Sequence, residues 1–307
     1  MSAKQIQNLG ESGSGGAADG VESAPVATPR GTVASIRRGL RHAPPSALLG
    51  LAIVATYLLT AILAPLVAPY SESDVVGSQF EPWSEQFVFG TDQLGRDMLS
   101  RLVFGARNTI GIAALTTGIS FLIGGVLGLL AAVNGGWPDQ LLGRAADVLM
   151  AIPSLIFALV LLSIFGSSVT NVILIIAVLD STRVFRLTRA VAINVVVMDF
   201  VEAARLQGEK LGWIMTREIL PNIMPPLIAE FGLRFCFVFL TISALSFLGL
   251  GIQPPTADLG SMVRENSTLI TYGDITPLLP AAVIALLVVA VNFVVDWFLH
   301  KASGLKG

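Results

Sequence analysis

The sequence predicts an all-α integral membrane protein with six transmembrane helices. Hydrophobic residues make up 53% of its 307 residues and charged residues only 13%, which is outside the usual composition of soluble globular domains. The hydrocarbon core of a bilayer, about 30 Å thick, needs roughly 20 mainly apolar residues for each helical span. The chain has six apolar stretches of suitable length, at residues 48–67, 110–133, 141–165, 169–190, 227–250 and 278–299.

Residues 1–43, before the first span, are predicted to form a disordered cytoplasmic tail with a basic juxtamembrane patch. The first 29 residues contain no aromatic residue and no apolar stretch that could form a core. Four arginines then precede the first span: Arg30, Arg37, Arg38 and Arg41. Positive charge beside a span holds that end of the chain in the cytoplasm.

The distribution of Lys and Arg predicts that both termini are cytoplasmic. With six spans and an internal N-terminus, the cytoplasmic regions carry 14 basic residues and the external regions carry four, as the preference for internal positive charge requires. Asp180, Arg183 and Arg186 interrupt the fourth span, but arginines near a helix end can extend to the interface. Losing this span would place the most basic loop outside, so the fourth span is retained.

The segment that follows the first span reads FGTDQLGRDMLSRLVFGARNTIG. Thr91 or Asp92 could cap a helix in this segment. Two pairs of opposite charge are spaced to interact across one helical turn: Asp92 with Arg96, and Asp97 with Arg101. The segment is therefore predicted to be an amphipathic helix that lies at the outer membrane face.

A polar segment, residues 195–226, separates the fourth and fifth spans and is predicted to be a cytoplasmic loop with two short helices. Gly208 and Gly212 can relax the backbone between them. Three prolines are predicted to stop the second helix and start the next span: Pro221, Pro225 and Pro226. Five apolar residues are unexpected in a merely solvated loop and suggest a docking surface: Val201, Leu206, Leu211, Trp213 and Ile214.

The string EAARLQG, followed by ILP, resembles the EAA loop in permease subunits of binding-protein-dependent ABC importers. The resemblance implies a coupling helix that is seated in a groove of a separate ATPase subunit. The predicted ATPase-coupling residues are Glu202, Ala203, Ala204, Gly208, Leu211, Ile219, Leu220 and Pro221. Glu209 and Lys210 depart from the pattern, since relatives commonly have Ala and Ser there, and this leaves exchange with a relative's ATPase in doubt.

Two external strings narrow the resemblance to the oligopeptide and dipeptide class, also called the peptide/nickel class. The first, GTDQLGRD, supplies the predicted extracytoplasmic motif of Gly90, Thr91, Asp92, Gly95, Arg96 and Asp97. The second, LSFLGLGIQPPTADLGSMV, begins at the end of the fifth span and faces the substrate path and the receptor in that class. Its glycines permit a bend and its prolines are predicted to end the helix: Gly249, Gly251, Pro254 and Pro255.

The resemblance implies the type I ABC importer permease fold and a multi-pass location in the bacterial inner membrane. It places a first transmembrane helix and extracytoplasmic segment at 44–109, the permease core at 110–300 and a cytoplasmic tail at 301–307. The implied partners are a second homologous permease subunit, two ATPase subunits, an extracytoplasmic substrate-binding protein and membrane lipid, without nucleic acid. Peptides are the expected substrates, and opines, nickel complexes and glutathione-like compounds remain open.

The chain is predicted not to be an enzyme and to have no catalytic, cofactor or metal site of its own. It lacks the G-x-x-x-x-G-K-[ST] phosphate loop, so ATP and Mg are expected on the partner ATPase subunits. His42 and His300 lie far apart without a ligand cluster around them. The alternative, a stand-alone secondary transporter or channel, would need acidic or histidine relays within the spans, or broken helices in matching halves. The sequence shows neither feature.

Other polar residues of the spans are assigned structural roles. Glu230 and Arg234 are four residues apart and are predicted to pair on one helix face, and Asp296 lies near the inner interface. Cys236 is predicted to be a small buried hydrophobe. Three arginines of the fourth span are interpreted as inner-face anchors, with a gate contact as the alternative: Arg183, Arg186 and Arg189.

Overall fold

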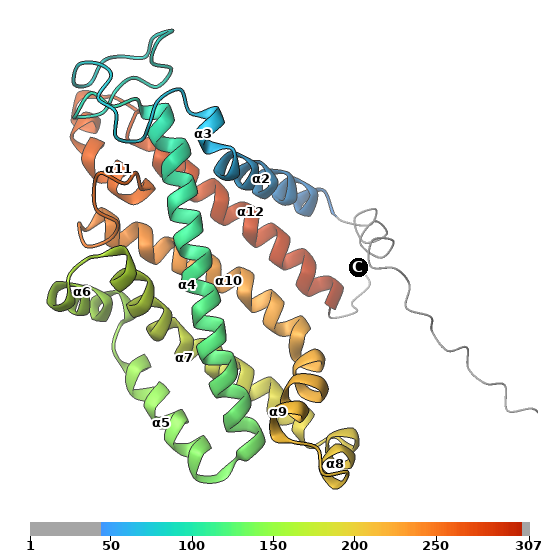
Figure 1. Ribbon diagram of the computed structural model, residues 1–307. Coiled ribbons are helices and arrows are strands. Elements are labelled where there is room, and N and C mark those ends of the chain that lie inside the picture. The colour runs from blue at the N-terminus through green and yellow to red at the C-terminus, as the bar shows by residue number, and fades with distance from the viewer. Residues whose placement is uncertain (1–43, 303–307) are drawn as a thin grey trace, which may run out of the picture. The chain divides into compact units, whose positions relative to one another are not determined.

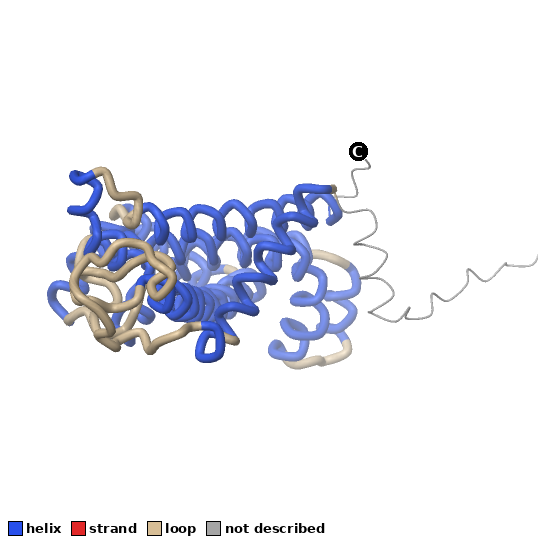
Figure 2. Tube along the Cα trace, turned by 90° about the horizontal axis from the view of Figure 1, so that it is seen from above, coloured by secondary structure: helices blue, strands red, loops and turns tan. Residues whose placement is uncertain are grey.

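The computed structural model describes residues 44–302, so the predicted tail at 1–43 and the last five residues lie outside the described residues. Every regular element of the described part is helical, apart from two isolated β-bridges (Figure 2). The longer helices are α2 (Pro45–Ile62), α4 (Met98–Asn134), α5 (Gly136–Ala151), α6 (Ser154–Phe165), α7 (Val169–Val196), α10 (Leu220–Phe247) and α12 (Leu278–Ala302) (Figure 1). The short ones are α3 (Ala64–Val67), α8 (Asp199–Leu206), α9 (Leu211–Trp213), a π-helical turn (Ile214–Ile219), α11 (Leu259–Asn266) and a 3₁₀ helix (Ser267–Tyr272).

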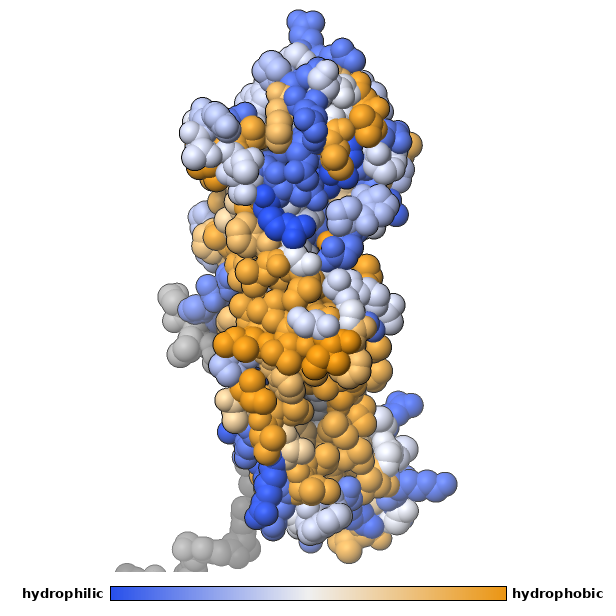
Figure 3. All heavy atoms as spheres, turned by 90° about the vertical axis from the view of Figure 1, so that its left-hand side faces the viewer, coloured by the Kyte–Doolittle hydropathy of each residue, from blue (hydrophilic) through white to orange (hydrophobic). Residues whose placement is uncertain are grey.

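Among residues 44–302, four helices are long and apolar enough to cross a membrane: Pro45–Ile62, Met98–Asn134, Leu211–Phe247 and Leu278–His300. A fifth span results if the bent pair of α5 and α6 counts as one. The predicted fourth span forms one unbroken helix, α7, but every 18-residue stretch of it contains Asp180, Arg183 and Arg186. Figure 3 shows a hydrophobic band between hydrophilic ends on one face of the molecule, as expected for a membrane-embedded protein.

The predicted third span, residues 141–165, is not a single straight helix but the bent pair of α5 and α6, which passes as a span only when the two helices are taken together. α5 and α6 meet at an angle of 87°. Ile152 is extended, with φ −93° and ψ 132°, and Pro153 follows it. A proline disfavours the helical conformation of the residue before it and lacks the N–H that would continue the helical ladder. The chain therefore turns sharply between the two halves.

The second long helix begins earlier than predicted. α4 starts at Met98, and Asp97 is its N-cap, since the Asp97 carboxylate accepts a hydrogen bond from the Ser100 N–H. The predicted separate amphipathic helix at the membrane face is therefore wrong, as is the predicted cap at Thr91 or Asp92. At about 1.5 Å per residue, the 37 residues of α4 span roughly 55 Å, more than a bilayer core needs.

Small residues let α4 lie close to α7. A Cβ atom at Gly124 would be 2.7 Å from Val184 Cβ, and one at Gly128 would be 2.8 Å from Thr188 Cβ and from the Phe185 carbonyl oxygen. Glycines four residues apart form the small-xxx-small pattern with which membrane helices approach each other. This contact positions α7 and its charged side chains against α4.

We expect Gly124→Ala to lower the thermal unfolding temperature of the detergent-purified chain, because the added methyl group meets α7 backbone and overpacking costs about 1–3 kcal/mol. Gly125→Ala is the matched control, since a Cβ at Gly125 meets nothing within 4 Å and alanine favours helix more than glycine does. Equal unfolding temperatures for the two variants would show that the close approach contributes nothing.

Candidate docking loop and polar clamp

α8, in the predicted coupling loop, has one buried and one exposed side. Val201 and Ala204 are buried in a hydrophobic cluster that they share with the C-terminal ends of α4 and α7. Glu202, Ala203 and Leu206 are exposed, and 83% of Leu206 is accessible. The glutamate and the first alanine of the EAA string therefore lie on a free surface, whereas the second alanine packs against the helices behind it.

Gly208 ends α8 with a φ of +81°, a backbone conformation that glycine adopts without a Cβ penalty. The Gly208 N–H donates to the Arg205 carbonyl oxygen (3.0 Å), and the Glu209 N–H donates to that of Ala204 (3.1 Å). These are the two hydrogen bonds of a Schellman C-cap. The predicted helix, glycine and helix are confirmed, except that Gly212 lies within α9 and makes no break.

The predicted docking residues divide into two groups. Val201 and Ile214 are buried in the chain's own core, so their assignment to a docking surface was wrong. Leu206, Leu211 and Trp213 are exposed, as are Glu209 and Lys210, the two departures from the family pattern. The exposed group forms the accessible surface of this loop, which we call the docking surface: Glu202, Ala203, Leu206, Glu209, Lys210, Leu211 and Trp213.

The second helix of the loop continues into the fifth predicted span. α9, the π-helical turn and α10 join in one helical stretch, Leu211–Phe247. The Leu220 N–H donates to the Met215 carbonyl oxygen, five residues back. A wider turn of this kind gives the ring of Pro221 space that an α-helix would deny it.

The prolines therefore do not separate the loop from the span as predicted. Pro221 lies in the first turn of α10, and Pro225 and Pro226 lie inside that helix. Of the other predicted coupling residues, Ile219 is buried and Leu220 is half-buried. These two residues connect the docking surface to the helix core rather than forming part of the surface.

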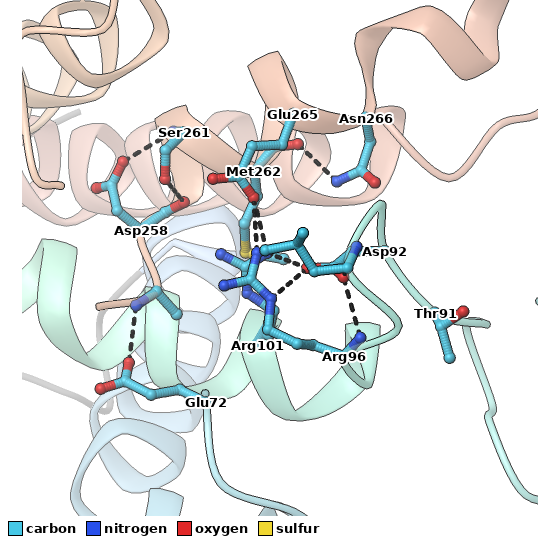
Figure 4. A network of polar contacts seen from close by, with 12 residues as sticks. Glu72, Thr91, Asp92, Arg96, Arg101, Asp258, Ser261, Met262, Glu265 and Asn266 are labelled. Carbon is cyan, nitrogen blue, oxygen red and sulfur yellow. Dashed lines mark hydrogen bonds and ion pairs between the residues drawn. The ribbon is translucent and has the colours of Figure 1, made fainter. Parts of the chain in front are cut away.

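At the other end of α4, four charged side chains form a buried network that we call the polar clamp: Asp92, Arg96, Arg101 and Glu265. Arg96 Nε lies 2.8 Å from Asp92 Oδ2, so the predicted Asp92–Arg96 pair is confirmed. The predicted Asp97–Arg101 pair was wrong, because Arg101 contacts Asp92 and Glu265. Arg101 Nη1 and Arg96 Nη2 lie 2.8 and 3.2 Å from Glu265 Oε2, which joins α11 to α4 (Figure 4).

The remaining residues of the GTDQLGRD motif fold the loop between α3 and α4, residues 68–97, against itself. The Thr91 hydroxyl donates to the Ser78 carbonyl oxygen (2.6 Å) and accepts from the Glu81 N–H (2.8 Å). Gly90 and Gly95 have φ of +72° and +74°. A Cβ at either glycine would collide with a carbonyl oxygen of the same loop. The motif is thus used internally, and its polar side chains other than Gln93 are buried.

Two further acidic residues hold this region together: Glu72 ties the loop to α4 and to the residue before Asp258, and Asp258 ties α11 to α4. Glu72 Oε2 accepts hydrogen bonds from Asn108 Nδ2 (2.9 Å) and from the Ala257 N–H (2.8 Å). Asp258 caps α11 by accepting from the Ser261 N–H (2.9 Å), and the Thr109 hydroxyl donates to its other oxygen (2.9 Å). Burial raises the pKa of the Asp258 carboxyl above its usual value. α4, α11 and the loop are therefore fixed to one another by polar contacts.

The end of the fifth span repeats the turn seen at Gly208. Gly249 has a φ of +88°, and the N–H groups of Gly249 and Leu250 donate to the carbonyl oxygens of Ser246 (3.0 Å) and Leu245 (2.9 Å). The predicted glycine bend is confirmed. Pro254 and Pro255 are exposed and follow the helix end at Phe247 by several residues, so they do not terminate the helix as predicted.

Sequence reasoning missed Glu72, Asp258 and Glu265. The Asp258-x-x-Ser261 spacing before α11 is a capping pattern that could have been found locally. Glu265 has no such signal, because its partner Arg101 lies 164 residues away in the chain.

Several polar residues predicted to have structural roles are paired in the helices. Glu230 Oε1 lies 2.7 Å from Arg234 Nε, which confirms that pair, and Cys236 is buried as predicted. Arg189 Nη2 donates to Asp139 Oδ2 (2.6 Å), which ties α7 to α5. The residues that the structure describes contain no group of three His, Cys, Asp or Glu side chains that could hold a metal ion.

The chain resembles known transport proteins. Residues 124–301 match a family described as "Binding-protein-dependent transport system inner membrane component". The chain is 35% identical over 252 residues to the dipeptide transport system permease protein DppC of Alkalihalophilus pseudofirmus, covering 81% of this chain and 83% of that protein. It is 37% identical over 257 residues to the di/tripeptide transport system permease protein DppC of Pseudomonas aeruginosa, covering 81% and 85%.

A solved structure also has a similar fold. The crystal structure of an amino acid ABC transporter with histidines matches with a TM-score of 0.50 and 20% sequence identity, covering 66% of this chain and 94% of that chain. At this identity the likeness bears on the fold alone.

Proposed function

The chain belongs to the family of binding-protein-dependent transport system inner membrane components, and from this premise we propose that it is the permease subunit of an ATP-driven importer of short peptides or related small solutes. The family match over residues 124–301 carries the proposal. Relatives named as dipeptide and di/tripeptide permeases, matching over 81% of the chain, support a peptide substrate. They also favour an importer subunit over a stand-alone secondary transporter.

We propose six membrane crossings with both termini on the cytoplasmic side of a bacterial inner membrane. The crossings would be α2 with α3, α4, the bent pair α5 and α6, α7, α10, and α12. The excess of Lys and Arg on the side assigned to the cytoplasm supports this orientation. Contacts within the chain for Asp180 and Arg189 support α7 as a crossing despite its charges.

The proposed energy source is a pair of separate ATPase subunits that grip the docking surface. The continuous helix Leu211–Phe247 supports this coupling, since a displacement of the loop is passed directly to the fifth span. Moving a two-state equilibrium from 1:99 to 99:1 requires about 5.5 kcal/mol of differential affinity, and only a rigid connection can transmit it. The Schellman cap at Gly208 and the packing of Val201 and Ala204 supply that rigidity.

The opposite end of the chain is proposed to receive substrate from an extracytoplasmic binding protein. The polar clamp and the contacts of Glu72 and Asp258 hold loop 68–97, α4 and α11 together. A surface fixed in this way can dock a soluble receptor without ordering itself at each encounter. A second, homologous permease subunit is proposed to complete the route through the membrane.

Reconstitution into proteoliposomes tests the proposal. This chain, a second permease, two ATPase subunits and the binding protein are expected to take up a labelled dipeptide only with hydrolysable ATP. Dipeptide uptake by this chain alone, or uptake driven by an ion gradient without the ATPases, would contradict the proposal.

A further inference from the structure

Four ionisable side chains meet halfway along α7 and α10, and we call them the charged cluster: Asp180, Arg183, Glu230 and Arg234. Asp180 Oδ1 lies 3.6 Å from Arg234 Nη1 and 3.9 Å from Arg183 Nη1. Its other oxygen accepts a hydrogen bond from the Ser120 hydroxyl of α4 (3.0 Å). The Arg234 guanidinium carbon also lies 4.6 Å from the centroid of the Phe237 ring.

The charged cluster lies far from both ends of the helices that carry it. In the continuous helix Leu211–Phe247, Arg234 precedes Phe247 by 13 residues and follows Leu211 by 23, which is about 20 and 35 Å at 1.5 Å per residue. Arg183 follows Val169 by 14 residues and precedes Val196 by 13, so its depth in α7 is equivalent. A hydrocarbon core about 30 Å thick that starts near Val169 of α7 and Phe247 of α10 encloses both positions.

Three of these side chains reach the surface of the chain. The exposed fractions of the side chains are 42% for Arg183, 21% for Glu230 and 13% for Arg234. A charged group at the centre of a bilayer is costly when it faces lipid, and such groups face protein or a water-filled cavity instead. This surface of α7 and α10 therefore does not face hydrocarbon.

The contacts within the cluster leave its arginines able to bind a solute. The distances from Asp180 to the two guanidinium groups exceed those of hydrogen bonds, so these contacts are electrostatic only. Arg234 is paired with Glu230 through Nε (2.7 Å), which leaves its terminal nitrogens for a solute. Beside them a small cleft of about 20 Å³, room for about one water molecule, opens between α6, α7 and α10. Asp180, Arg183, Ser154 and Thr241 line it together with five apolar residues. Charges of both signs and polar groups thus share one partly open surface.

We propose that this surface lines the water-filled route through the membrane, where Arg183 and Arg234 bind the carboxylate of a zwitterionic solute and Glu230 binds its ammonium group, with Asp180 buried behind the two arginines. The proposal rests on the proposed function as an importer and names the part of the chain that the solute crosses. Arginine favours planar carboxylates, which it can bind through two parallel hydrogen bonds.

Cysteine labelling of the complete complex in membranes tests the route. In a Cys236→Ala background, Arg183→Cys and Glu230→Cys are each treated with a permanently charged thiol reagent. Val289→Cys is the control, because Val289 is an exposed apolar residue near the middle of α12. Labelling at positions 183 and 230 is expected to be about 100-fold faster than at position 289. The charged reagent must enter hydrocarbon to reach position 289, and the free-energy cost of that step slows labelling by about this factor. Equal rates at all three positions, with and without ATP, would overturn the inference.

Transport by charge variants tests solute binding. Arg234→Gln is expected to lower kcat/KM for a free dipeptide by about tenfold or more, the value of a charged hydrogen bond. The amide-capped dipeptide should be affected little. The same binding protein delivers both dipeptides to every variant. A change in the ratio of kcat/KM for the free dipeptide to that for the amide-capped dipeptide therefore reports selection by the permease. Asp147→Asn is the matched control, since the Asp147 side chain is 66% exposed on α5, and it should leave the ratio unchanged.

The double variant Glu230→Gln/Arg234→Gln separates solute binding from a structural pair, because Glu230 Oε1 lies 2.7 Å from Arg234 Nε. Removing both charges of a structural pair restores stability, so wild-type uptake and selectivity in the double variant would overturn the inference. If the double variant still shows reduced uptake of the free dipeptide, the result supports solute binding by this surface. The wild-type complex is assayed first, and a wild-type complex that takes up no dipeptide with ATP would count against the proposed function. The labelling rates would still decide the route.

Discussion

Replacing Gly208 with proline is expected to abolish substrate-stimulated ATP hydrolysis by the assembled transporter, while the chain still enters the membrane. Proline cannot adopt the φ of +81° found at this position. It also lacks the N–H that donates to the Arg205 carbonyl oxygen, and it disfavours the helical conformation of Gln207 before it. The turn between α8 and α9 would be lost, and with it the fixed orientation of the docking surface.

The measurement is ATPase activity of the reconstituted complex with and without loaded binding protein. Gly208→Ala and Gly273→Ala form a matched pair, because both glycines have φ near +80° and a Cβ at either would meet nothing within 4 Å. Each alanine carries a similar backbone cost, of about 1 kcal/mol. A larger loss of stimulation at 208 than at 273 would assign the effect to coupling. Full stimulation in an assembled Gly208→Pro complex would show that the loop is not the coupler.

The parts of the fold that could be predicted are those that follow from local pattern. Apolar length located the helices of five predicted spans, and the Gly208 turn followed from a glycine between two helix-forming segments. The Glu230–Arg234 pair followed from helical spacing alone. In each case the signal lies within a few residues of the feature, so tertiary context did not override it.

The failures have identifiable physical causes. Pro153 lies inside an apolar run whose length predicts one span, but a proline breaks the helical ladder, and the chain bends there. Prolines usually mark a helix boundary, but α10 accommodates both Pro225 and Pro226. Val201 and Ile214 are more apolar than a solvated loop requires, which predicts a docking surface. They are instead buried by the ends of α4 and α7, which are distant in sequence. Arg101 was paired with its helical neighbour, although its partner Glu265 comes from α11.

Arg101→Met is expected to unfold the junction of loop 68–97, α4 and α11, and to lower the thermal unfolding temperature of the chain. Arg101 is completely buried and contacts the carboxylates of both Asp92 and Glu265. Removing one member of a buried ionic network leaves uncompensated charge, which costs about 3–5 kcal/mol. Arg96 would remain as the only cation beside these two acids among the residues that the structure describes.

Unfolding temperature and limited proteolysis of loop 68–97 measure the effect. Arg107→Met is the matched control, because Arg107 lies on the same helix but is exposed, and surface substitutions usually change stability by less than about 0.5 kcal/mol. Adding Glu265→Gln to Arg101→Met should recover part of the loss, since it removes the one excess negative charge and leaves the Asp92–Arg96 pair balanced. If Arg101→Met is as stable and as protease-resistant as Arg107→Met, the junction is held by its hydrogen bonds and apolar packing, and the polar clamp contributes no net stability.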